Sequence, residues 1–186
     1  MKTVSFSVIA LGCLLVASPV LAQSVGEKTG VNSALGVSPS TPDFVKQVAI
    51  SDMFEIESNK LGEQKGNTAE RSFASQMVKD HTKTSNELKQ LVSTGKVKAE
   101  LPAALDSAHQ SKLDKLKSKT GKDFSSDFSS MQKDAHEDAV SLFERYAKGG
   151  DNKQLKAFAA KHLPHLKAHQ RMAEGLQKQT TGEKTR

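Results

Sequence analysis

Apolar residues recur every three to four positions through four long segments of the chain, and most glycines fall between these segments. This period puts the apolar side chains on one face of an α-helix, whereas a strand would need a period of two. The long helices are predicted at residues 43–62, 68–94, 123–147 and 151–177, with a shorter one between residues 102 and 121. The sequence therefore predicts an all-α fold.

Polar residues and glycines mark the ends of these helices. Asn67 or Thr68 is expected to cap the second long helix, because a side-chain oxygen there can accept from the first free backbone N–H groups. Gly150 ends the third long helix, and Asp151 is expected to cap the fourth.

The connection between the second and third long helices is the longest, at about 30 residues, and it contains the short helix. A bundle with only short loops would not need this length, whereas ferritin-like bundles have one long crossover. We therefore expect a ferritin-like antiparallel four-helix bundle with a short extra helix in the crossover between helices two and three.

Residues 1–22 have the features of a secretory signal peptide. A positive start is followed by an apolar run at residues 4–16, which is too short to cross a bilayer, and cleavage is expected after Ala22. The preferred location is the bacterial periplasm. The competing hypothesis is a lipoprotein anchored through Cys13, because residues 10–13 loosely resemble a lipobox.

The remaining chain is predicted to form one domain, as expected for a total of 186 residues. Residues 23–42 are rich in Ser, Gly, Thr, Val and Pro and are predicted to be a flexible tether. Residues 43–177 form the bundle, and residues 178–186 are predicted to be a disordered tail. No later segment is apolar enough to be a transmembrane anchor.

Composition excludes several classes of function. The 27 Lys and Arg residues outnumber the 21 Asp and Glu residues by only six and are spread along the chain, so no nucleic-acid partner is expected. The single cysteine excludes a disulfide framework and a thiolate-rich zinc site. No nucleophile motif, P-loop or dinucleotide loop occurs, which leaves metal-assisted chemistry as the one open catalytic class. A protein partner is left open.

Several ionisable residues fall on the apolar faces. A rotation of 100° per residue turns four histidines toward the core or its edge: His81, His136, His162 and His169. On the first helix, at least one of Asp52 and Glu55 also points inward, and the axial level relative to His81 slightly favours Asp52. Axial level does not choose between His162 and His169.

Such groups need partners, because each would cost several kcal/mol if it were buried unpaired. A metal ion is one partner, since neutral imidazole and carboxylate suit zinc, iron, copper or manganese. A hydrogen-bonded polar cluster with trapped water is the alternative.

An ordered set of residues resembles a known family over nearly all of residues 43–176. The set is Phe54-Glu55-Ile56, Met77-Val78-Lys79-Asp80-His81, Gly121 with Phe124, His136, and Leu163-Pro164 followed by His169. It is similar to an exported bacterial ferritin-like family, domain-of-unknown-function family 4142. The resemblance implies a ferritin-like bundle and selects Glu55, His81, His136 and His169 as the characteristic polar positions. It implies no reaction.

The chain departs from di-iron carboxylate bundles, which place Glu three residues before His on two helices. Val78 and Leu166 stand at those positions, so ferroxidase or oxygen-activating chemistry is not expected. The main hypothesis is an exported periplasmic bundle that binds a single transition metal through Glu55 and three histidines. The alternative is an envelope stress or protein-interaction module in which the His/Glu cluster is purely structural.

Overall fold

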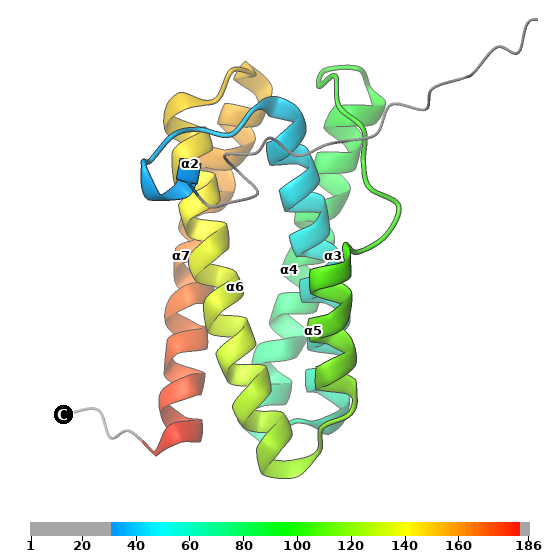
Figure 1. Cartoon of the computed structure of the whole chain (residues 1–186), viewed down its shortest axis with the longest axis vertical. Helices are drawn as coiled ribbons and strands as arrows, with labels where there is room; N and C mark the ends of the chain where they lie inside the picture. The colour runs from blue at the N-terminus through cyan, green and yellow to red at the C-terminus, as the bar shows by residue number, and fades with distance from the viewer. Residues whose placement is uncertain (1–30, 183–186) are drawn as a thin grey trace, which may run out of the picture.

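Four long helices lie side by side in the computed structural model, which describes residues 31–182 (Figure 1). They are α3 (Thr41–Lys65), α4 (Thr68–Ser93), α6 (Gly121–Gly149) and α7 (Lys153–Thr181). Two shorter helices, α2 (Val31–Ala34) and α5 (Ser107–Lys117), lie beside them. Residues 31–182 contain no strand, and the predicted all-α fold is confirmed.

The bundle is made of two antiparallel hairpins. Helix α3 pairs with α4, and α6 pairs with α7, while contacts between α3 and α6 and between α4 and α7 close the other two sides (Figure 1). Helices α4 and α6 run in the same direction, so residues 94–120 must return along the bundle, and α5 packs against α3 on the way. The predicted bundle and the short helix in its crossover are confirmed; the ferritin-like assignment stays a prediction.

The start of α4 follows from its capping residues. Asn67 accepts hydrogen bonds from the backbone N–H groups of Ala69 and Glu70, and the Glu70 carboxylate accepts from the backbone N–H of Asn67 at 2.7 Å. This reciprocal arrangement satisfies donors that no helical carbonyl can reach. The expected cap at Asn67 is confirmed.

The expected cap of the last helix is wrong by one residue. Asn152, not Asp151, caps α7 and accepts from the backbone N–H of Leu155 at 3.0 Å. The Asp151 carboxylate instead accepts from the hydroxyl groups of Thr41, at 2.6 Å, and Tyr146, at 3.0 Å. It thereby ties the start of α3 to the turn between α6 and α7.

The helices extend past both ends of the predicted bundle. Helix α3 begins at Thr41, two residues before the predicted start, and α7 continues to Thr181, past the predicted start of the tail at residue 178. Within the predicted tether, Arg145 of α6 donates to the Val37 carbonyl at 2.7 Å. The predicted signal peptide, residues 23–30 and residues 183–186 lie outside the described residues.

The interior has three parts along the bundle axis. The first apolar cluster lies where α3 begins and contains Phe44, Val45, Val48, Leu88, Leu142, Phe143, Tyr146, Leu155 and Phe158, among others. The second apolar cluster lies at the other end and contains Phe73, Ala74, Met77, Leu116, Phe124, Phe128, Ala173 and Leu176. Between them is a polar layer of Asp52, Glu55, Ser58, Asn59, His81, Gln132, His136 and His169, all of them buried.

The second apolar cluster leaves no room for a side chain at one position of α3. A Cβ atom at Gly62 of α3 would lie 2.7 Å from the Phe128 ring and 2.9 Å from the Ala74 Cβ. Only glycine therefore fits at this contact between α3, α4 and α6.

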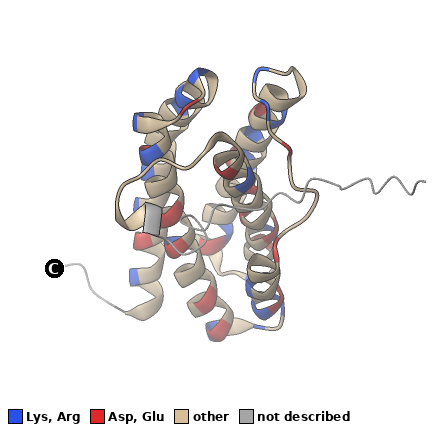
Figure 2. Ribbon diagram, turned by 45° about the horizontal axis from the view of Figure 1, so that its top comes forward, with Lys and Arg blue, Asp and Glu red and all other residues tan. Residues whose placement is uncertain are grey.

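Charged residues of both signs lie on the outside of the long helices (Figure 2). Among residues 31–182, no helix is both long enough and apolar enough to cross a membrane.

Candidate metal centre

Three histidines from three helices meet in the polar layer. His81 of α4, His136 of α6 and His169 of α7 each offer one ring nitrogen, and these nitrogens all lie within 4.8 Å of one another. The Nε2 atoms of His81 and His136 are 3.5 Å apart. Two nitrogens bound to one tetrahedral metal at 2.0–2.1 Å would be separated by about 3.4 Å. The observed spacing is close to this value.

Each histidine uses one ring nitrogen for a protein acceptor. His81 donates from Nδ1 to the Asp52 carboxylate at 2.8 Å, and His136 donates from Nδ1 to the backbone carbonyl of Gln132 at 2.8 Å. A carbonyl or an ionised carboxylate can only accept, so the proton is assigned to Nδ1 in both rings. In the neutral rings, Nε2 is then left with a free lone pair.

His169 has the opposite tautomer. Its Nε2 donates to the Asp80 carboxylate at 3.0 Å, which leaves Nδ1 with the lone pair. Nδ1 is buried and has no hydrogen-bond partner among residues 31–182. In all three rings, therefore, an acceptor holds one nitrogen and leaves the other as a potential ligand, as is usual for metal-bound histidines.

The two candidate carboxylates of α3 are both buried but differ in their contacts. Asp52 binds His81 directly. Glu55 lies one turn further on, outside the group formed by the three histidines, and accepts from the Asn59 side chain at 2.9 Å. Glu55 is thus the one member of the predicted ligand set that the structure does not bring into this group.

A network of amides surrounds Glu55. Asn59 also donates to the Gln132 side-chain oxygen at 3.0 Å, and Gln132 donates to the Ser58 hydroxyl at 3.1 Å. These contacts join α3 to α6 beside the histidines. They leave Glu55 Oε1 and Asp52 Oδ2 without a hydrogen-bond partner in the described part of the chain.

His162, the alternative to His169, lies outside the group. Its Nε2 contacts the Glu87 carboxylate at 3.0 Å, and Thr84 lies 3.5 Å from its Nδ1. Glu87 also binds Lys161 at 2.8 Å. Both ring nitrogens of His162 therefore face protein atoms.

Burial and neighbouring charge shift the pKa values of the site. Burial raises the pKa of Glu55 to about 7, and it lowers the pKa of His136 to about 3 with help from the nearby His81. Burial alone would lower the pKa of His81, but the hydrogen bond to Asp52 and the Asp52 charge raise it. Burial therefore disfavours the charged forms of both Glu55 and His136.

The unpaired atoms in the polar layer test whether a metal fits. His169 Nδ1, Asp52 Oδ2 and Glu55 Oε1 are buried acceptors without donors in the described chain. An unsatisfied buried acceptor costs about 1–3 kcal/mol, and more if it is charged. A cation held by the histidines would satisfy His169 Nδ1, and imidazole nitrogens are ligands that suit first-row transition metals. The three histidines therefore fit a single metal ion.

A small pocket of about 70 Å³ reaches this site between α4 and α7, with His81 and His169 in its lining. A larger pocket of about 570 Å³ lies on the opposite face, between α3, α5 and α6. None of the three histidines lines the larger pocket. Of these two pockets, therefore, only the small one leads to the histidines.

Sequence reasoning missed two of the three acceptors that orient the rings, the Asp80 carboxylate and the Gln132 carbonyl. Asp80 precedes His81 directly and lies about 100° away around the helix, so it does not share the apolar stripe that marked the core positions. The Gln132 carbonyl is one turn before His136, where only the backbone contact of the folded helix reveals its role.

Residues 26–176 match the family model described as domain of unknown function, DUF4142. The match spans most of the chain, and the protein belongs to this family. Neither the search of curated proteins nor the search of solved structures found a match.

Proposed function

We propose that this protein is an exported metal-binding bundle that holds one divalent transition-metal ion in its polar layer. His81, His136 and His169 would supply three nitrogen ligands. The observation that carries the proposal is the shared pattern of the three rings, in which each has one nitrogen held by an acceptor and one nitrogen left as a ligand.

Glu55 is proposed as the fourth ligand. It comes from α3, the one long helix without a histidine in the group, and its buried Oε1 has no hydrogen-bond partner among the described residues. Four ligands from four helices would cross-link the whole bundle around the ion. The metal would act by lowering the free energy of the folded state, because the unfolded chain presents no preformed site.

Export belongs to the same proposal. It rests on the sequence of residues 1–22, whose positive start, apolar run and cleavage site are those of a signal peptide. Cell fractionation of the native protein tests it, and recovery of uncleaved protein in the cytoplasm would contradict it.

Calorimetric titration of the chelator-treated full chain with Zn²⁺ or Co²⁺ tests metal binding. The protein must be purified without a polyhistidine tag. We expect binding of one ion per chain and loss of that binding in His81→Ala. The matched control is His109→Ala. His109 is on α5, lines the larger pocket on the other face of the bundle, and contacts Asp106.

Circular dichroism of each variant shows whether it is folded. If the wild type binds no metal while it is folded, the proposal fails. The polar layer is then a purely structural cluster, as the interaction-module alternative requires.

A further inference from the structure

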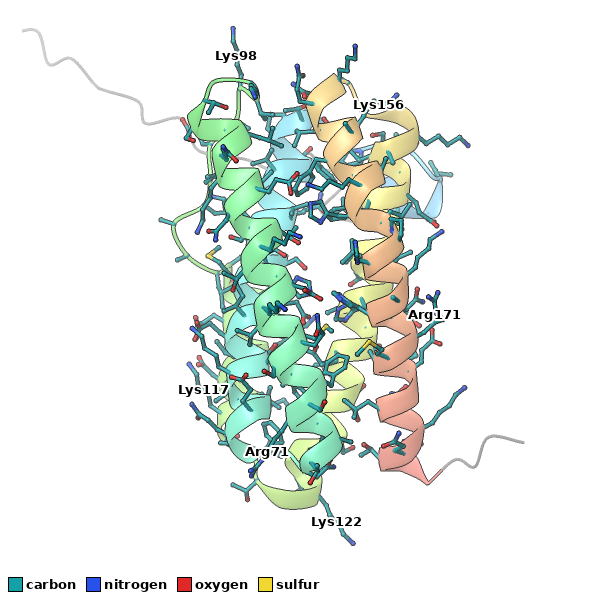
Figure 3. All side chains as sticks on the ribbon, turned by 180° about the vertical axis from the view of Figure 1, so that it is seen from behind. Arg71, Lys98, Lys117, Lys122, Lys156 and Arg171 are labelled. Atoms are coloured by element: carbon teal, nitrogen blue, oxygen red, sulfur yellow. The ribbon has the colours of Figure 1, made fainter. Side chains whose placement is uncertain are left out.

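The pocket between α4 and α7 connects the surface to the three-histidine site. His81 and His169 are almost completely buried and form part of its lining, whereas His165 lies exposed on the same pocket. Figure 3 views the bundle from the side on which α4 and α7 lie in front, with their side chains meeting between the two helices. A volume of about 70 Å³ is small, but it exceeds the space that one water molecule needs.

Packed side chains lie on two other sides of the site. The Phe73 ring packs edge-on against His136, with 6.2 Å between the ring centroids, and Met77 of the same second apolar cluster is fully buried. Toward α3, the site is backed by Asp52, Glu55 and the Asn59 network. An ion that left in these directions would have to disrupt close packing.

The pocket carries groups that can hold a divalent ion in transit. The exposed His165 offers an imidazole, and the Asp80 carboxylate that binds His169 also lines the pocket. A metal ion that loses its water ligands one at a time can exchange them for such groups. Thr84 also lines the pocket, and its hydroxyl donates to the Asp80 carbonyl at 3.1 Å.

Lys83 provides the opposing charge. Its side chain is exposed on the same pocket, and no ion pair of Lys83 occurs among residues 31–182. The ammonium group of Lys83 beside the route repels a divalent cation, and salt screens this repulsion. Lys83 should therefore slow the approach of the ion.

We propose that the metal ion enters and leaves through this pocket, past His165 and Asp80, so that the buried site exchanges its ion without unfolding. This inference rests on the proposed function. It makes the protein a reversible metal carrier or store, whereas an enclosed site would hold its ion permanently as a structural element.

Stopped-flow kinetics on the full chain test the route. Metal-free protein is mixed with Co²⁺ to measure loading, and loaded protein is mixed with excess EDTA to measure release. Thr84→Leu fills the pocket with a larger side chain that helices tolerate well. We expect it to slow loading and release about tenfold each, which corresponds to a barrier higher by about 1.4 kcal/mol. The equilibrium affinity should stay unchanged, because both directions cross the same barrier.

Three further variants sharpen the result. Lys83→Gln should load faster than the wild type, and the gain should shrink at high salt. His165→Ala should load more slowly. His109→Ala, on the other face, should match the wild type and is the control.

The outcomes separate the two proposals. If Co²⁺ does not bind the folded wild type, the proposed function fails. If Co²⁺ binds but Thr84→Leu, His165→Ala and Lys83→Gln all exchange at the wild-type rate, the metal site stands and the route is wrong. If release follows the rate of global unfolding, the claim of exchange without unfolding is overturned.

Discussion

The side chains of the first apolar cluster and of the polar layer are equally buried. Burial stabilises the fold in the apolar cluster, whereas in the polar layer it opposes ionisation. In the apolar cluster, Phe44 stacks on Tyr146 with 4.0 Å between the ring centroids, and it forms a T-shaped pair with Phe143 at a centroid distance of 5.3 Å. Burial of such rings stabilises the fold by about 25 cal/mol for each Å² removed from water. In the polar layer, Glu55 and His136 are each only 1% exposed, and their burial opposes ionisation.

This difference assigns separate tasks to the two regions. The apolar clusters at both ends hold the helices in register, so the middle can contain groups that lower stability. A cost of this kind is typical of functional sites. The same packing also keeps the three rings close to the arrangement a metal needs, which reduces the reorganisation required on binding.

The largest effect is expected in the first apolar cluster. Phe44→Ala should lower the free energy of unfolding by about 3–5 kcal/mol, because it removes a fully buried ring and leaves a cavity. Urea denaturation in the presence of chelator measures this loss. Leu35→Ala is the control, since that side chain is 71% exposed and should change stability by less than about 0.5 kcal/mol. Equal effects of the two variants would show that the cluster does not dominate stability.

A pH experiment isolates the cost of the polar layer. The folded protein raises the pKa of Glu55 from 4.5 to about 7, so between these pH values it binds more protons at this group than the unfolded chain. The Glu55 contribution to stability is therefore present below pH 4.5 and is lost as the pH rises through 7. The loss is at most about 3 kcal/mol.

Glu55→Gln should remove this dependence in the metal-free protein. Relative to the wild type, the variant should gain stability between pH 5 and pH 8, as measured by urea denaturation in chelator. Glu57→Gln, an exposed position on the same helix, is the matched control. If Glu55→Gln loses as much stability as the wild type between pH 5 and pH 8, another group causes the pH dependence.

The smallest effect concerns the acceptors behind the rings. Asp52→Asn and Asp80→Asn keep the shape of the side chain but remove the charge that orients His81 and His169. We expect metal affinity to fall about 10–100-fold in each variant, as is usual for groups that orient metal ligands. Competition with a chromophoric chelator measures the change, with the exposed Asp134→Asn as control. Unchanged affinity would mean that these carboxylates only satisfy hydrogen bonds.

The sequence was sufficient to predict which faces are buried. The helical period alone turns His81, His136, His162 and His169 inward, and all four are buried. The level of each side chain along the bundle axis was harder to predict, because a shift of four residues moves a side chain by about 6 Å along the helix. The cap of α7 is an example, because it lies at Asn152, one residue after the predicted position. An error of one residue at a turn changes which side chains of the two helices lie opposite each other.

The contacts of the two carboxylates show what neither period nor resemblance supplies. The axial estimate favoured Asp52 beside His81, and the structure places that contact at 2.8 Å. The resemblance selected Glu55, which lies one turn away among amides. The distinction depends on side-chain rotamers and on the Asn59 and Gln132 network, which involve residues 73 positions apart.

The division into two hairpins determines when the site can form. The α3–α4 hairpin supplies Asp52, Glu55 and His81, and the α6–α7 hairpin supplies His136 and His169. Neither half of the chain contains the complete set, so a refolding molecule acquires its ligand cage only when the hairpins dock. Capture of a coloured ion such as Co²⁺ during refolding would therefore time that docking step, separately from the earlier appearance of helical structure.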